Sequence, residues 1–179
     1  MPEARRLCRI RIVRLKPTEY LPHHLIPYPG SDYRQRTVFY LAPEVTLITW
    51  EAFAAGRVAR DERSAFTRLR SRTEIHRGGV PKARDGLDLP GVSEPFGGYS
   101  YSAAVYVLAP RDLGLLAENL HRSLGGVSSA RASASVPAPG LCVVRVLADD
   151  ADALYRALNH VRDTAREALG LPVPARTVW

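Results

Sequence analysis

Residues 33–53, YRQRTVFYLAPEVTLITWEAF, contain two runs of aromatic and β-branched residues on either side of a short segment, APE. Such residues are enriched in β-strands, and a proline between two apolar runs favours a turn. The pattern predicts two strands, 33–41 and 45–53, that pair as a hairpin. The middle of the chain is therefore expected to be β-structure.

Further strands are predicted on both sides, because apolar residues alternate with polar or basic ones at a period of two. In residues 7–15, LCRIRIVRL, this alternation is typical of a half-buried strand at a sheet edge. Residues 80–98 carry many glycines and prolines and are expected to form a loop, and the small-residue stretch 128–140 is a loop or a weak strand. The other predicted strands are 64–77, 99–109 and 141–148.

Two helices are predicted toward the C-terminus, where the apolar period changes from two to 3.6. Residues 110–124 place leucines at helical spacing after a proline and before two glycines. A second helix begins at Asp149 with aspartates in its first turn, which the helix dipole favours, and ends before Gly170. The sequence therefore predicts a mainly β (α+β) fold of many short strands, with two helices toward the C-terminus.

The size and charge of the chain limit its class. The 179 residues, 46% of them hydrophobic, suffice for one domain with a core. The net charge of +7 lies in the first half, since residues 1–86 hold 17 lysines and arginines against 9 aspartates and glutamates. A basic half suits nucleic acid, an anionic surface or an acidic partner protein. No apolar run reaches about 18 residues and no signal peptide is recognisable, so we expect a cytoplasmic protein with no membrane partner.

The familiar catalytic and cofactor motifs are absent from the sequence, including GxxxxGK[ST], GxGxxG, GxSxG and HExxH. Cys8 and Cys142 lack the CxxC spacing of zinc sites and are expected to be buried thiols. Glu118 and His121 form a single ExxH pair that is expected at the surface. We therefore predict that the protein is not an enzyme. The alternative is an unrecognised metal-dependent hydrolase, which would retain stoichiometric metal.

Two adjacent histidines, His23 and His24, stand between prolines in residues 20–30, YLPHHLIPYPG. In a strand, neighbouring side chains point to opposite faces and could not share one ion, whereas in a proline-bounded turn they could. Imidazole is a favoured ligand of nickel, zinc and copper. Two interpretations remain open here: a polar turn, or a contact with a metal or a partner.

Three arginines, Arg68, Arg70 and Arg72, share one face of the predicted strand 64–77, and Leu69 lies on the other. The stripe is either a solvated strand face or a surface that meets a protein or a phosphate.

Several stretches in this order resemble urease accessory proteins of the UreD type, also called UreH. The resemblance rests on the proline steps of residues 20–30, on Trp50-Glu51, on Gly56-Arg57 and on Glu62. It continues through RLRSRTEIHRGG, GGYSYSAAVYVL, VVRVLADDADALYRAL and the terminal PARTVW. Nearly all 179 residues take part. The resemblance implies one UreD-like domain over residues 1–179, and we expect it to correspond to the C-terminal two-thirds of the family, without the family's N-terminal segment. The histidine pair and Asp61 depart from the family pattern.

The resemblance implies a β-helix-like body and a non-enzymatic role in urease maturation. Members of the family assist nickel insertion into apo-urease by bridging the UreF–UreG nickel-delivery complex and urease. Nickel(II) would be transient cargo, with no tightly bound cofactor, because a conduit needs weak successive contacts. Glu51 and Glu62 are carried over by motif position as residues of the nickel passage. His23 and His24 are added for their imidazole chemistry alone.

The basic half is explained under this hypothesis by attraction to an acidic partner, with Arg68, Arg70 and Arg72 on the partner-binding face. The competing hypothesis is a basic nucleic-acid-binding module, whose affinity would fall steeply with salt. No recognition helix or aromatic and basic sheet signature supports that alternative, so we expect no nucleic-acid partner.

Overall fold

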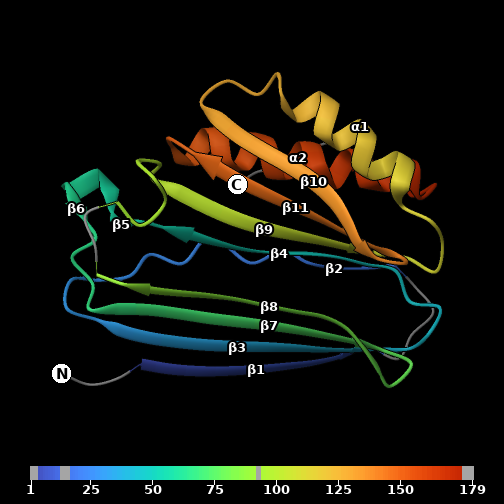
Figure 1. Cartoon of the computed structure of the whole chain (residues 1–179), viewed down its shortest axis with the longest axis horizontal. Helices are drawn as coiled ribbons and strands as arrows, with labels where there is room; N and C mark the ends of the chain where they lie inside the picture. The colour runs from blue at the N-terminus through green and yellow to red at the C-terminus, as the bar shows by residue number, and fades with distance from the viewer. Residues whose placement is uncertain (1–3, 13–16, 92–93, 175–179) are drawn as a thin grey trace.

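The computed structural model describes residues 17–91 and 94–174 in full, and the backbone of residues 4–12. Two β-sheets face each other, and two helices cover the outer face of one of them (Figure 1). Sheet A contains β1 (Ala4–Ile12), β3 (Asp32–Leu41), β7 (Arg68–Arg77) and β8 (Val80–Pro90), in that order. Sheet B has the order β10 (Ala130–Ala138), β11 (Leu141–Ala148), β9 (Tyr101–Leu108), β4 (Leu47–Ala54) and β2 (Thr18–Tyr20).

The first half of the chain coils between the two sheets. It places β1 in sheet A, β2 in sheet B, β3 in sheet A and β4 in sheet B, then returns to sheet A with β7. Successive turns of this coil lie side by side in the same direction, because β1, β3 and β7 pair in parallel and β2 pairs in parallel with β4. This repeated, parallel winding is the β-helix-like body that was predicted, and the sheets do not close into a barrel.

The predicted hairpin of strands 33–41 and 45–53 is wrong, although both strands exist. β3 pairs with β1 and β7, and β4 pairs with β2 and β9, so the two strands belong to different sheets. The reason is burial on both faces, since every residue of β4 is buried between sheet A and the helices. A strand covered on both faces belongs in the middle of a layered fold rather than in a hairpin with one solvated face.

The side chains of β4 divide the core in two. Ile48, Trp50 and Ala52 face the helices and pack with residues of α1 and α2. Leu47 points the other way and packs against Phe39 of β3. By this alternation, Glu51 points into the space between the two sheets.

Two segments predicted as loops or weak strands are regular strands. Residues 80–90 form β8, which follows β7 through a turn at Gly78 and Gly79, both with positive φ (57° and 79°). Pro81 and Pro90 lie in this strand at the edge of sheet A, where a missing N–H is tolerated, and residues 94–98 of the predicted loop contain no strand. Residues 130–138 form β10 at the edge of sheet B.

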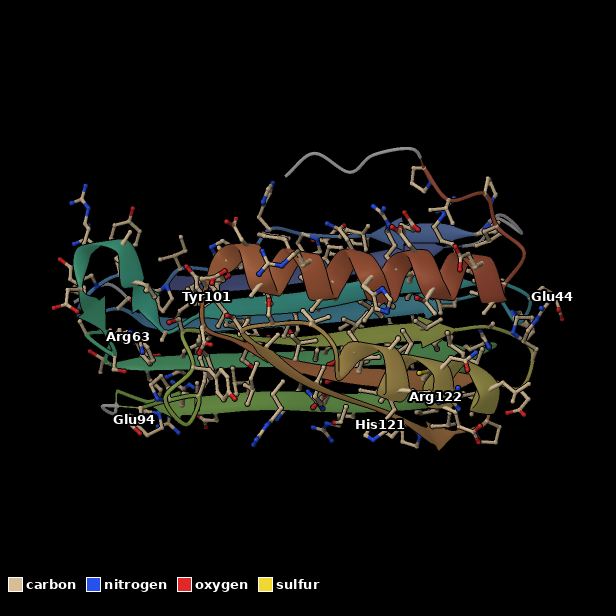
Figure 2. The ribbon with its side chains drawn as sticks, turned by 90° about the horizontal axis from the view of Figure 1, so that it is seen from above. Glu44, Arg63, Glu94, Tyr101, His121 and Arg122 are labelled. Atoms are coloured by element: carbon tan, nitrogen blue, oxygen red, sulfur yellow. The ribbon has the colours of Figure 1, made fainter. Side chains whose placement is uncertain are left out.

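Both predicted C-terminal helices exist, but α1 begins at Gly114 and not at Pro110. α1 spans Gly114–Leu124 and α2 spans Ala151–Ala168, and they pack beside each other over sheet B (Figure 2). Asp150 caps α2, since its carboxylate accepts a hydrogen bond from the amide of Ala153 at 2.7 Å. Gly170 follows with a φ of 69°. No helix in the described part of the chain has the length and apolar character needed to span a membrane.

Short elements complete the fold at one end of the sheets. They are β5 (Gly56–Arg57), the 3₁₀-helix η1 (Val58–Arg60) and β6 (Glu62–Arg63). The predicted strand 7–15 corresponds to β1, and its last residues, like the end of the PARTVW tail and the Cys8 side chain, lie outside the described residues. The Cys142 thiol is buried, as predicted, and burial raises its pKa to about 11.

Candidate functional site

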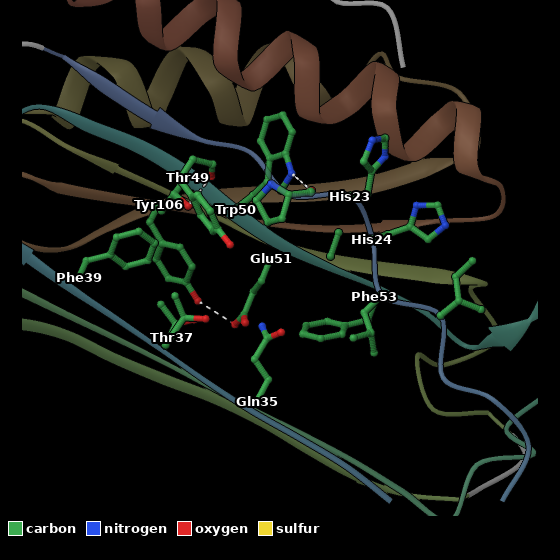
Figure 3. A pocket seen from close by; sticks show the side chains of 16 residues that line it. His23, His24, Gln35, Thr37, Phe39, Thr49, Trp50, Glu51, Phe53 and Tyr106 are labelled. Carbon is green, nitrogen blue, oxygen red and sulfur yellow. Dashed lines mark hydrogen bonds between the residues drawn. The ribbon is translucent and has the colours of Figure 1, made fainter. Parts of the chain in front are cut away.

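A cavity of about 260 Å³ lies between the two sheets, bordered by residues 20–26 and by strands β3, β4, β7 and β9 (Figure 3). The segment 20–26 is held in place by its backbone. The amide of Leu25 donates to the carbonyl of Ala52 at 2.8 Å, and the Trp50 indole donates to the carbonyl of Pro22 at 2.8 Å. These bonds fix the histidine pair at the border of the cavity.

Glu51 is the carboxylate of this cavity and is only 8% exposed. It points from β4 toward Gln35 of β3 in Figure 3, and one of its oxygens accepts a hydrogen bond from the Ser71 hydroxyl at 2.7 Å. Burial raises the pKa of Glu51, and hydrogen bonds from Ser71 and Thr73 oppose the rise. A buried carboxylate that is costly to ionise gains by binding a cation or keeping its proton.

Tyr106 stands beside Glu51, with its hydroxyl oxygen 3.5 Å from Oε1 of the carboxylate. The Tyr106 hydroxyl donates to Oδ2 of Asp85 at 2.6 Å, and the same Asp85 oxygen is paired with Arg145. Burial and the neighbouring carboxylates raise the pKa of Tyr106. Tyr106 also lines a groove of about 370 Å³ between β8 and β11 that contains Asp85 and Arg145. Tyr106 therefore lines both the cavity and this groove.

The two histidines lie at the opposite border of the cavity, under α2. Nδ1 of His24 lies 3.0 Å from the Tyr155 hydroxyl, and Nδ1 of His23 lies 3.3 Å from the same oxygen. Burial lowers the pKa of His24, and the charge of His23 lowers it further. Residues His23, His24 and Glu51 thus line one cavity, while both imidazoles contact Tyr155 of α2. Their part in a nickel passage stays a prediction.

A pH dependence follows from His24. Because its pKa in the folded chain lies below the unfolded value, protonation at low pH favours the unfolded state. We expect His24→Gln to lose less stability than the unchanged chain when the pH falls from about 7.5 to about 5.5. Urea unfolding at both pH values measures this. His121→Gln, at an exposed position of α1, is the control, and an equal loss in all three chains would contradict the assignment.

Glu62 does not line this cavity. It lies on β6, where its carboxylate is paired with the Arg57 guanidinium, and one of the two hydrogen bonds measures 2.8 Å. Arg57 in turn lies 4.9 Å from the ring centre of Tyr28. Within residues 17–91 and 94–174, no group of three or more His, Cys, Asp and Glu side chains could hold a metal ion.

The predicted arginine stripe lies on the outer face of sheet A, as its alternation indicated. Arg68 pairs with Asp88 through two hydrogen bonds of 2.7 Å, and Arg70 pairs with Asp32 at 3.2 Å. Arg72 is exposed and borders a depression of about 430 Å³ with Arg34, Arg36 and Arg70. Part of the positive charge of this face is therefore neutralised within the sheet.

Comparison with known proteins identifies the family. The family model described as UreD urease accessory protein matches residues 3–179.

The chain belongs to the UreD family.

Curated UreD proteins agree with this membership. Urease accessory protein UreD 2 of Streptomyces griseus is 35% identical over 167 residues, which cover 87% of this chain and 57% of that protein. The UreD of Haloarcula marismortui is 29% identical over 165 residues, covering 88% of this chain and 55% of that protein. The UreD of Herpetosiphon aurantiacus is 39% identical over 95 residues. This UreD chain spans little more than half the length of the first two relatives.

Sequence reasoning missed three polar groups around Glu51 of this UreD chain: Ser71, which donates to Glu51, Tyr106, which lines the cavity, and Asp85, which lines the neighbouring groove. The signal for Ser71 was present, because it stands between Leu69 and Thr73 on the inward face of β7, where a polar residue needs a partner. Tyr106 approaches Glu51, and Asp85 contacts Tyr106, from strands that are distant from β4 in the sequence, so no local pattern marks them.

Proposed function

We propose that this UreD chain assists nickel insertion into apo-urease, as a non-enzymatic scaffold that bridges the UreF–UreG complex and urease. Its family membership supports a part in urease maturation. The observation that carries the nickel role is the buried Glu51 carboxylate in a cavity that His23 and His24 also line. Oxygen and imidazole groups both suit nickel.

The arrangement of these groups favours the passage of a nickel ion over its retention. The imidazoles of His23 and His24 share a hydrogen-bonding partner, Tyr155, and Glu51 is held by Ser71. Each group therefore offers a partial contact, and the described residues provide no closed ligand cage. An ion that must be released is better served by such weak successive contacts.

The route would continue past Tyr106. Its ring lies between the cavity and the groove that contains Asp85, so a side-chain movement would join the two spaces. Asp85 then offers a second carboxylate on the far side of the ring. Glu62, which is paired with Arg57 and does not line this cavity, would act at another point of the path between partners.

Transfer in a purified system tests this function. Apo-urease, UreF, UreG and nickel are incubated with and without the chain, and the nickel bound per urease is measured. We expect more nickel in urease when the chain is present. We also expect the isolated chain to retain less than stoichiometric nickel after desalting. Stoichiometric retention would instead support the metal-dependent hydrolase.

The partner-binding part of the proposal gives a separate prediction for the outer face of sheet A. Arg72→Glu reverses an exposed charge next to three other arginines and is expected to slow association with an acidic partner by about three- to tenfold at low salt. Surface plasmon resonance with the UreF–UreG complex and with apo-urease measures the rate. Arg122→Glu, at an exposed position of α1, is the matched control, and equal effects of both changes would reject this face.

A further inference from the structure

A second cavity, of about 420 Å³, lies where several turns meet at one end of the sandwich. It shares no lining residue with the Glu51 cavity. We call it the turn cavity and define it by its lining residues: Pro43, Arg77, Lys82, Ala109, Pro110, Arg111, Asp112, Pro139 and Gly140. Glu44, next to one of them in the sequence, is labelled at this end of the molecule in Figure 2.

Arg77, at the end of β7, is a buried cation in the wall of the turn cavity and is 9% exposed. One nitrogen, Nη2, donates to the carbonyl of Val45 at 2.6 Å. Its Nε is buried and has no hydrogen-bond partner. No carboxylate among the described residues forms an ion pair with Arg77. Burial lowers the pKa of Arg77, and the negative charge of Glu44 partly opposes this effect.

A buried guanidinium without a carboxylate is costly, since arginine keeps its charge at all ordinary pH values. Such a group gains most from an anion that supplies the missing acceptors. The fold therefore places the positively charged Arg77 guanidinium, without a carboxylate partner, in the wall of an open cavity.

The rest of the wall adds to the positive potential. Lys82 and Arg111 also line the turn cavity, against one carboxylate, Asp112. That carboxylate accepts a hydrogen bond from the amide of Gly114 at 3.1 Å, at the start of α1. Gly140 allows its backbone to pack against Ala109 and Arg77. A Cβ at this position would lie 2.5 Å from the carbonyl oxygen of Ala109 and 3.4 Å from Nη1 of Arg77.

We propose that the turn cavity binds a carboxylate of an acidic peptide segment from a partner protein, with Arg77 as its main contact. A carboxylate matches the fork of donors that a guanidinium presents. The cavity is much larger than one carboxylate, and three prolines line it, so neighbouring residues of a peptide have apolar surface to contact. This inference does not depend on the nickel role.

Fluorescence anisotropy with the full chain and a labelled seven-residue peptide rich in Asp and Glu tests the proposal. A peptide of the same length in which Asn and Gln replace the acids is the neutral probe. We expect saturable binding of the acidic peptide alone. Arg77→Met is expected to weaken it by about 30-fold or more. Arg122→Met removes an equal charge from an exposed position of α1, outside the turn cavity, and is expected to change binding less than about twofold.

Two further variants keep the test decisive if Arg77→Met does not fold. Lys82→Met should weaken binding, and Asp112→Asn, which retains the acceptor for Gly114, should tighten it, each by about two- to fivefold. Competition by free succinate would show that a carboxylate alone suffices, and its failure to compete would show that peptide contacts are needed as well. The proposal is overturned if no saturable binding is found, or if Arg122→Met weakens binding as much as Arg77→Met does. It is also overturned if Lys82→Met and Asp112→Asn do not change the affinity in opposite directions.

Discussion

Glu51→Gln is expected to lower the nickel delivered to urease by roughly tenfold or more, while the chain stays folded and binds its partners. Glutamine has the shape of glutamate and can still accept the hydrogen bond from Ser71, but it carries no charge to offset that of a divalent ion. The measurement is the nickel content of urease after maturation with the unchanged or altered chain.

The stability of the same variant separates function from folding. Because burial raises the pKa of Glu51, its ionised form is disfavoured in the folded chain, and this penalty grows as the pH rises above the unfolded value of 4.5. Glu51→Gln should therefore be at least as stable as the unchanged chain near neutral pH, with the difference shrinking in acid. Glu118→Gln, at an exposed position of α1, is the control. Unchanged nickel delivery by Glu51→Gln would remove Glu51 from the nickel path.

Trp50→Ala is expected to cost about 3–5 kcal/mol of the free energy of unfolding, the range for a buried aromatic side chain. Trp50 is 2% exposed, packs under the helices and donates to the carbonyl of Pro22. Since a domain has only about 5–15 kcal/mol of stability, this change would leave the chain barely folded. Urea unfolding followed by circular dichroism measures the loss.

Two companion variants define what Trp50 contributes. Trp50→Phe keeps most of the packing but leaves the Pro22 carbonyl without its donor, and should cost less than the alanine change. Leu115→Ala, at a leucine that is 76% exposed on α1, should change stability by less than about 0.5 kcal/mol. A Trp50→Ala loss as small as that of Leu115→Ala would contradict the packing of β4 against the helices.

The local parts of the fold were predictable because their signals are local. The leucine period and the flanking glycines located α1, and the aspartates before residue 151 located α2. Strand pairing was not predictable in this way. β3 joins strands that precede and follow it by about one turn of the coil, and nothing in residues 33–53 distinguishes that pairing from a hairpin. β8 was missed because its prolines and glycine are tolerated only at a sheet edge, which is a tertiary property.

In the candidate site, too, some residues could be predicted from local sequence signals and others depend on the tertiary structure. Glu51 and the histidine pair were identified from motif and chemistry, and β4 brings them to one cavity because the 20–26 segment pairs with its backbone. Asp85 and Tyr106, which lie 21 positions apart in the sequence, add further polar groups next to Glu51 in the sandwich. Arg77 belongs to the strand whose outward arginines drew attention, yet it points inward, and only its burial singles it out.

Complementation tests the central claim, participation in nickel insertion, most directly. The chain is expressed in a cell that carries urease, UreF and UreG but lacks its own UreD, and nickel per urease is measured together with urease activity. The proposal predicts that the unchanged chain restores both and that Glu51→Gln restores neither. A chain that is abundant and recovered with the urease complex, yet leaves urease without nickel, would contradict it.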